Sequence, residues 1–344
     1  MFFSIRRFLL IGVLTLLASS ILNAGPSGYH VTKTVKLGGE GGWDYLTVDA
    51  KARRVYISRG THVMVVDADT GALLGDIPNT NGVHGIAIAA DLDKGFISDG
   101  RDSNVMIFDL KTLKVLGNAP AGKNPDAIIY DPASKRVFAF NGSSKDATAI
   151  DAKTGTVAGT IALGGKPEFA VADEKGHVFV NIEDTSEIVQ FDSNKLAVES
   201  RWKIAPGEEP SGLAMDRKHR RLFSVCSNKL MVVVDADNGK VLTTLPIGAG
   251  TDAAGFDPET GFAFSSNGGD GTVTVAHEDS PDKFTVVENV TTLRRARTMA
   301  LDAKTHQVYT VTAEFGQPPA PTKEQPRPRA PMVPGSFTLL ILSR

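Results

Sequence analysis

Seven polar residues recur in this sequence at intervals of 40 to 45 positions, and their types are those that binding and catalytic sites use. They are Asp44, His84, Asp126, Glu168, Ser211, Asp252 and Arg297. Four carboxylates, an imidazole, a hydroxyl and a guanidinium could together bind a ligand, hold a cation or transfer protons. Any such chemistry requires a fold that brings the seven positions to one place.

These residues suggest two kinds of reactive site. Asp126, Glu168 and Asp252 are candidate ligands for Ca²⁺ or Mg²⁺, because hard cations prefer oxygen donors, although no loop has the ligand spacing of a calcium-binding motif. His84 beside a metal ion could act as the general base of a lyase or lactonase. The other histidines are expected at outer strands or turns, where solvated histidines are ordinary; they are His30, His62, His177, His219, His277 and His306.

A surface that binds a small molecule or a protein without catalysis is the third interpretation, and it is the one we prefer. No complete catalytic set accompanies His84, since enzymes of this kind usually present more than one histidine at the site. The cofactor, if there is one, is left open at this point, as is the question of whether the protein is an enzyme.

Composition and charge exclude several classes of protein. The chain has 344 residues, of which 42% are hydrophobic, and this is ample for a folded core. Its single cysteine excludes a disulfide framework and a zinc site built from paired thiolates. A formal charge of −2 gives no electrostatic footprint for nucleic acid or for an anionic membrane surface, so nucleic acid is not an expected partner.

The first 24 residues have the layout of a secretory signal. Arg6 and Arg7 precede an apolar run from Phe8 to Leu17, and small residues follow up to Ala24. The run is short for a bilayer core of about 30 Å, although a retained anchor is the alternative. We therefore expect a mature protein of residues 25–344, periplasmic or secreted, with no membrane span after cleavage.

The rest of the chain is a repeat with a period near 42 residues. An aspartate marks the same place in six units, at Asp49, Asp131, Asp173, Asp216, Asp257 and Asp302, with Ala89 in the second unit. A later marker falls at Asp67, Asp109, Asp151, Asp192, Asp235 and His277. Seven units emerge, with starts near residues 42, 82, 124, 166, 209, 250 and 295.

Each unit divides into four short strand-like runs separated by turn residues. In the third unit, Asp131-Pro132 turns the first pair of runs, and the segment 151–155 makes the last turn, with Gly155 available for a positive φ. Four-stranded units of this length repeated seven times predict an all-β, seven-bladed β-propeller. The last unit has only three runs, so we expect residues 29–35 near the mature N-terminus to complete it and close the ring.

The segment Phe264–Val273 matches the YVTN-type repeat, and residues from about Tyr29 to Arg344 resemble the YncE-like family of secreted seven-bladed propellers. The resemblance implies export and a binding or scaffold role, and it brings no shared catalytic motif. The resemblance also implies two kinds of enzyme as alternatives, virginiamycin-type lyases and lactonase-like propellers.

In a propeller of this kind, the innermost strands line the central channel, and the seven polar residues lie where those strands begin, five positions before the first marker. We therefore expect them to converge at one mouth. Trp43 could stack on a ligand there, or it could equally hold the first blade against the last. A second polar set, at the ends of the second runs, faces the same side and is expected to be ordinary loop polarity; it comprises Arg59, Asp99, Arg101, Asn141, Asn181, Glu183, Ser227, Asn267, Asp270 and Glu314. The proline-rich segment 316–335 is expected to be a surface loop, with roles as a lid or a partner-binding segment left open.

Overall fold

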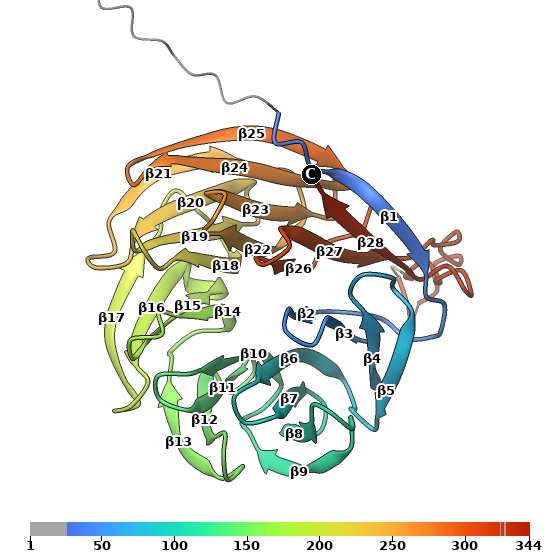
Figure 1. Ribbon diagram of the computed structural model, residues 1–344, viewed down its shortest axis with the longest axis horizontal. Coiled ribbons are helices and arrows are strands. Elements are labelled where there is room, and N and C mark those ends of the chain that lie inside the picture. The colour runs from blue at the N-terminus through green and yellow to red at the C-terminus, as the bar shows by residue number, and fades with distance from the viewer. Residues whose placement is uncertain (1–25, 324, 327) are drawn as a thin grey trace, which may run out of the picture.

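The computed structural model describes residues 26–344 apart from positions 324 and 327, so the expected signal peptide at 1–24 lies outside the described residues. Four-stranded antiparallel sheets, seven in number, stand around a central axis (Figure 1). The predicted seven-bladed β-propeller is therefore confirmed. Within the described residues the helical element is the single turn η1 (Glu183–Thr185), and no helix there is long and apolar enough to cross a membrane.

The first three blades run from the axis outward in chain order. Blade 1 comprises β2 (Leu46–Asp49), β3 (Arg54–Ser58), β4 (His62–Asp67) and β5 (Leu73–Pro78). Blade 2 comprises β6 (Val83–Ala89), β7 (Lys94–Asp99), β8 (Asn104–Asp109) and β9 (Val115–Pro120). Blade 3 comprises β10 (Pro125–Asp131), β11 (Arg136–Asn141), β12 (Asp146–Asp151) and β13 (Val157–Ala162).

The remaining blades follow the same order, except that the last one takes its outer strand from the start of the chain. Blade 4 comprises β14 (Pro167–Ala172), β15 (His177–Ile182), β16 (Glu187–Asp192) and β17 (Ala197–Lys203). Blade 5 comprises β18 (Pro210–Asp216), β19 (Arg221–Cys226), β20 (Leu230–Asp235) and β21 (Val241–Pro246). Blade 6 comprises β22 (Thr251–Asp257), β23 (Phe262–Asn267), β24 (Thr272–Ser280) and β25 (Lys283–Thr291). Blade 7 comprises β26 (Met299–Asp302), β27 (Gln307–Thr312), β28 (Thr338–Ser343) and β1 (His30–Lys36).

The repeated aspartates form the turns because their carboxylates accept hydrogen bonds from backbone amides of the residues that follow. Asp131 accepts from the amides of Ala133 and Ser134, each at 3.1 Å. Asp151 accepts from the amide of Thr154 at 2.7 Å, and Gly155 closes that turn with a φ of 76°. Such local bonds stop one strand and start the next at the same place in each blade, and this regularity produces the period in the sequence.

The hydrophobic core lies between neighbouring blades rather than within any one of them. Between blades 1 and 2, for example, Tyr56 and Val65 pack with Ile97 and Phe108, and all four are fully buried. Six further clusters of the same kind complete the circle. Each blade is therefore stabilised by the two beside it.

Strand β1 closes the ring as predicted. It pairs antiparallel with β28, with Val31 opposite Leu342 and Val35 opposite Leu339. Val35 also packs on the cluster between blades 7 and 1, and Val31 on the cluster between blades 6 and 7. The first described strand thus covers an edge that β28 would otherwise expose.

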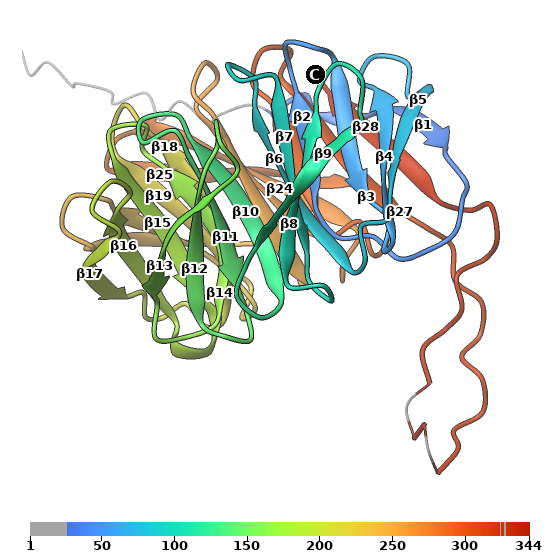
Figure 2. The ribbon, with the colours of Figure 1, turned by 90° about the horizontal axis from the view of Figure 1, so that it is seen from below.

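The proline-rich segment leaves the ring between β27 and β28 as a long arm that projects away from the blades at their rim (Figure 2). Its base is held by a bridge between Phe315 and Met332 and by the amide of Gly316, which donates to the carbonyl of Pro331 at 2.9 Å. The guanidinium of Arg295 lies 3.7 Å from the centre of the Phe315 ring. The arm does not lie across the central axis (Figure 1).

Close approach of the inner strands yields a first prediction. A methyl group added at Gly212 would lie 2.5 Å from the backbone nitrogen of Ala254 in the next blade, whereas one added at Gly42 would meet nothing within 4 Å. We expect Gly212→Ala to lower the free energy of unfolding by about 1–3 kcal/mol, because backbone cannot move aside as a side chain can. Thermal unfolding measures this, with Gly42→Ala as the matched control. Equal melting temperatures for the two variants would contradict the argument.

Candidate functional site at the mouth of the channel

A β-bulge at the start of the innermost strand positions five of the seven predicted residues. In blades 2 to 6 the register of the first strand pair shifts between Val83 and Ile86, Pro125 and Ile128, Pro167 and Ala170, Pro210 and Leu213, and Thr251 and Ala254. His84, Asp126, Glu168, Ser211 and Asp252 lie inside these intervals. Asp44 and Arg297 come two residues before β2 and β26 begin. A bulge frees its residue from the ladder and turns its side chain, and here the same device recurs around the axis.

Polar residues on the second strands form hydrogen bonds with backbone groups where the inner strands begin. Ser58 Oγ accepts from the amide of Asp44, and Ser98 Oγ from the amide of Gly85, both at 2.8 Å. Asn181 Nδ2 reaches across to the next blade, where it donates to the carbonyls of Ser211 at 2.8 Å and Gly212 at 3.1 Å. The mouth is therefore held by side-chain to backbone bonds between and within blades.

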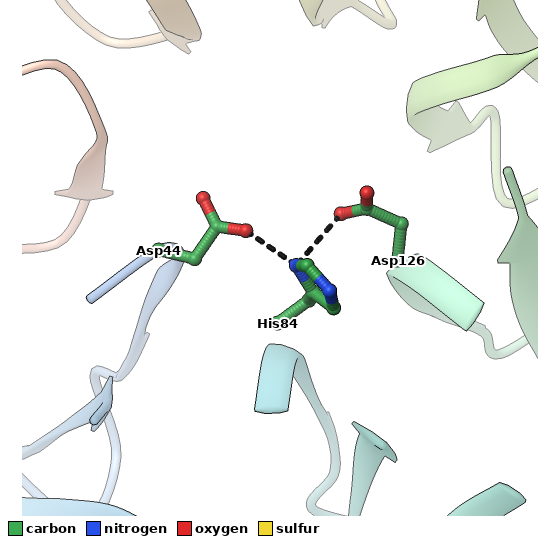
Figure 3. Close-up of side chains that lie close together, drawn as sticks. All are labelled: Asp44, His84 and Asp126. Carbon is green, nitrogen blue, oxygen red and sulfur yellow. Dashed lines mark hydrogen bonds and ion pairs between the residues drawn. The ribbon is translucent and has the colours of Figure 1, made fainter. Parts of the chain in front are cut away.

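Asp44, His84 and Asp126 come together from three consecutive blades. His84 Nδ1 lies 2.6 Å from Asp44 Oδ2 and 3.5 Å from Asp126 Oδ1, so the two carboxylates flank one imidazole (Figure 3). One donor atom from each residue falls within 4.8 Å of the others, a spacing that a single cation could bridge. Asp44 joins the first blade to the last, since Arg297 Nη2 donates to its Oδ1 at 2.8 Å.

Arg297 continues the chain of contacts to the far side of the mouth. Its Nη1 forms an ion pair with Asp252 Oδ2, and Ser211 Oγ donates to Asp252 Oδ1 at 2.8 Å. Both carboxylate oxygens of Asp252 therefore have partners, Arg297 and Ser211. The three carboxylates expected from the sequence as cation ligands do not form the cluster: Asp126 faces His84, Asp252 faces Arg297, and Glu168 Oε1 lies 2.7 Å from Lys166 Nζ.

Sequence reasoning missed Lys166 and Tyr45. Lys166 stands two positions before Glu168 and pairs with both Glu168 and Glu183. Tyr45, which follows Asp44, is buried and lies with its ring centre 4.6 Å from that of Phe169. No periodic signal marks either residue, because their counterparts in the other units differ.

Burial and mutual repulsion dominate the electrostatics of the ring. Side chains of its four carboxylates are only 12% to 18% exposed. Burial, with the charge of Asp126, raises the pKa of Glu168 to about 7, and burial likewise raises the pKa of Asp126. Burial alone would lower the pKa of His84, but the bond to Asp44 and the charges of Asp126 and Glu168 outweigh it, so this pKa is raised. The site therefore favours a cationic imidazole and disfavours a full set of ionised carboxylates.

Half of the second polar set proves to be internal, five residues of the ten. Arg59 is fully buried, with its guanidinium 3.6 Å from the centre of the Phe337 ring, and burial lowers its pKa to about 10. Four other members, Asp99, Asn141, Asn181 and Asn267, are at most 1% exposed. Loop polarity was the wrong interpretation for these five, since their side chains are buried in the structure.

A cavity of about 660 Å³ opens beside the ring, next to the base of the arm. Trp43 and Phe315 line it with Arg295 and Arg297, and Pro328 and Arg329 of the arm contribute to its outer wall. The volume is typical of a small-molecule site, and the aromatic rings give it apolar surface. Trp43 packs against Phe315 and Phe337 of the last blade, as the second of its two expected roles requires, while it also lines this cavity.

Known proteins share the fold of this chain. No family model matches it, and no curated protein does either. Among solved structures, hydrazine synthase of Kuenenia stuttgartiensis superimposes with a TM-score of 0.69 at 15% identity, covering 79% of this chain and 92% of that one. A chain in a crystal structure of a mitotic checkpoint complex superimposes with a TM-score of 0.74 at 12% identity, covering 98% and 99%. The likeness is one of fold alone.

Asp99 offers a test of the electrostatics around His84. Burial and the charge of Asp102 raise the pKa of Asp99 to about 7, whereas an unfolded aspartate titrates near 4. Between these values the folded protein holds a proton that the unfolded chain releases, so the free energy of unfolding falls as pH rises through this window. Asp99→Asn removes that dependence.

Between pH 4 and pH 8 we expect the free energy of unfolding of Asp99→Asn to rise by about 2–4 kcal/mol relative to that of the native protein. Denaturant unfolding of both proteins at each pH measures the difference. A stability difference that does not change with pH would contradict the raised pKa.

Proposed function

We propose that this protein is an exported binding scaffold of the YVTN-repeat, YncE-like type, whose channel mouth takes up a small ligand or a protein partner through a cationic group. The observation that carries the proposal is the crowding of four largely buried carboxyl groups in the ring. The propeller likeness is compatible with it, as is the resemblance of the repeat. Periplasmic or secreted location rests on the sequence of residues 1–24 alone.

The charge balance of the mouth argues for a cation as its complement. The ring and its direct ion-pair partners contain five carboxylates, namely those of Asp44, Asp126, Glu168, Asp252 and Glu183. If all five were ionised, Arg297, Lys166 and a protonated His84 would offset only three of the charges. An ammonium or guanidinium group placed near Asp126 would relieve the remaining repulsion in a site that water already reaches poorly.

The neighbouring cavity supplies a place for the rest of such a ligand. It shares Arg297 with the ring, so a molecule could present its cationic group to the carboxylates and its apolar body to Trp43 and Phe315. Arg295 and Arg329, which also line the cavity, would favour a carboxylate at the far end of that body. A zwitterionic molecule or a short peptide segment has this distribution of charge.

Binding can be tested with a panel of alkylamines, arylamines and short basic peptides. We expect members of the panel to bind, and the double variant Asp126→Asn/Glu168→Gln to weaken that binding by about 10- to 100-fold, the usual cost of a lost charge-assisted hydrogen bond. Isothermal titration calorimetry measures it. The matched control is Glu174→Gln/Asp237→Asn, which makes the same change of charge in turns on the opposite face. Binding that survives at the mouth variant, or a panel preference for anions, would contradict the proposal.

A second function is favoured by the cluster of Asp44, His84 and Asp126, whose donor atoms lie within 4.8 Å of one another. A divalent cation held there would polarise a carbonyl or activate a water molecule, and the protein would be a metal-assisted lyase or lactonase. The two carboxylates suit Ca²⁺ or Mg²⁺, whereas the imidazole extends the choice to transition metals. The chain's own contribution is the orientation of His84 by Asp44.

This enzymatic alternative predicts turnover of a lactone or ester that chelator abolishes, that added divalent cation restores and that His84→Ala loses by at least about a hundredfold. Product formation on a panel of lactones and esters, with Ca²⁺, Mg²⁺ and Mn²⁺ supplied, measures it. Inactivity across the panel, or activity that His84→Ala retains, would leave the binding function alone.

A further inference from the structure

A second cluster of ionisable side chains lies on the face opposite the mouth, between blades 5 and 6. Asp216 ends β18, His219 lies in the turn to β19, and Glu278 is on β24 of the next blade. His219 Nδ1 is 2.7 Å from Asp216 Oδ2 and 2.7 Å from Glu278 Oε1. One donor atom from each residue lies within 4.8 Å of the others.

The repeat itself shows that two of these three residues are departures from the common pattern. The amide of Glu278 donates to the carbonyl of Gly261, the bond that the corresponding residue makes to the first turn of its own blade. Those corresponding residues are Ala68, Leu110, Ala152, Ser193 and Ala236. A buried carboxylate at this place therefore occurs in blade 6 alone.

His219 departs from the pattern in the same way. It stands three positions after the first marker, where the other turns of equal length carry Ala52, Leu92, Ser134, Thr260 and Thr305. Two unusual residues in neighbouring blades thus meet across one interface. Neither is needed for the turn or for the strand, since five other blades form both without them.

The carboxyl group of Glu278 is not satisfied by the protein. Glu278 is 9% exposed and Asp216 is 2% exposed. His219 bonds Glu278 Oε1, whereas Glu278 Oε2 is buried and has no hydrogen-bond partner among the described residues. A buried oxygen without a partner costs free energy that a bound cation would recover.

The geometry points to a site for a divalent transition metal ion, of which Zn²⁺ is the type, held by Asp216, His219 and Glu278. Imidazole nitrogen with carboxylate oxygen is a donor set for Zn²⁺, at distances of about 2.0–2.2 Å. A dication would balance the two carboxylates beside a neutral imidazole. Arg221 on β19 does not take that role, because Asp235 and Asp282 each engage it at 3.2 Å. The ion would tie blade 5 to blade 6.

Zn²⁺ binding to the whole protein tests the inference. The His84→Ala variant is used as the starting protein, because it removes the cluster at the mouth and leaves the opposite face intact. We expect this protein to bind one equivalent of Zn²⁺ by calorimetry, to retain it by elemental analysis after dialysis, and to melt at a higher temperature with the ion.

Adding Glu278→Ala should raise the Kd for Zn²⁺ by at least about a hundredfold and abolish the thermal shift, as should His219→Ala. Both substitutions install a residue that other blades carry at the same place, so the fold should tolerate them. Glu259→Ala, in an exposed turn of the same face, is the matched control and should leave the Kd unchanged. Absence of Zn²⁺ binding in the His84→Ala protein, or binding that neither Glu278→Ala nor His219→Ala weakens, would overturn the inference.

Discussion

Pairing of β1 with β28 is the interaction on which the remaining structure depends. A blade in this protein has no core of its own, since the buried side chains lie between sheets, and every blade therefore needs a neighbour on each side. Residues from opposite ends of the chain provide that neighbour for blades 1 and 7. The same closure builds the mouth, because Thr298 Oγ1 donates to the carbonyl of Asp44 at 2.6 Å and Arg297 bonds its carboxylate. In an open ring, Arg297 and Asp44 would lie apart. Asp44 would then keep its contact with His84 but lose its contact with the guanidinium of Arg297.

Crowding at the axis explains why charge gathers there. Inner strands converge so closely that Gly212 has the backbone of the next blade in the place of a side chain. In five of the seven blades, a bulge at the start of the inner strand turns one side chain away from this space and toward the mouth. Together with Asp44 and Arg297, which precede their strands, these side chains lie close to one another and are largely buried. Raised pKa values at Glu168 and Asp126 follow from that arrangement and not from any one contact.

The sequence predicted what depends on local bonding and missed what depends on neighbours. Turn aspartates such as Asp131 act through amides two and three positions away, so they repeat visibly, and strand number, ring closure and the mouth positions could be read from them. The bulges were invisible because pairing partners define them. Burial of Arg59 against Phe337 was likewise hidden, since these residues lie far apart in the chain. The partnership of His84 with Asp44 and Asp126, rather than a set of three carboxylates, required the distances between blades.

In a repeat protein, equivalent positions of the blades can be compared with one another, and the comparison separates structural from functional positions. Where every blade must form the same turn, the residues are the same, as the first-marker aspartates are in six blades. The seven mouth positions face no such shared demand, and they hold five different residue types. Six of these residues nevertheless form one line of contacts, in the order Ser211, Asp252, Arg297, Asp44, His84 and Asp126. At the opposite face, Glu278 and His219 differ from their counterparts and meet each other. Random surface variation would scatter such departures, whereas a site requires them to coincide in space. Both the mouth and the cluster between blades 5 and 6 show this feature: residues that differ from their counterparts in other blades lie in contact with one another.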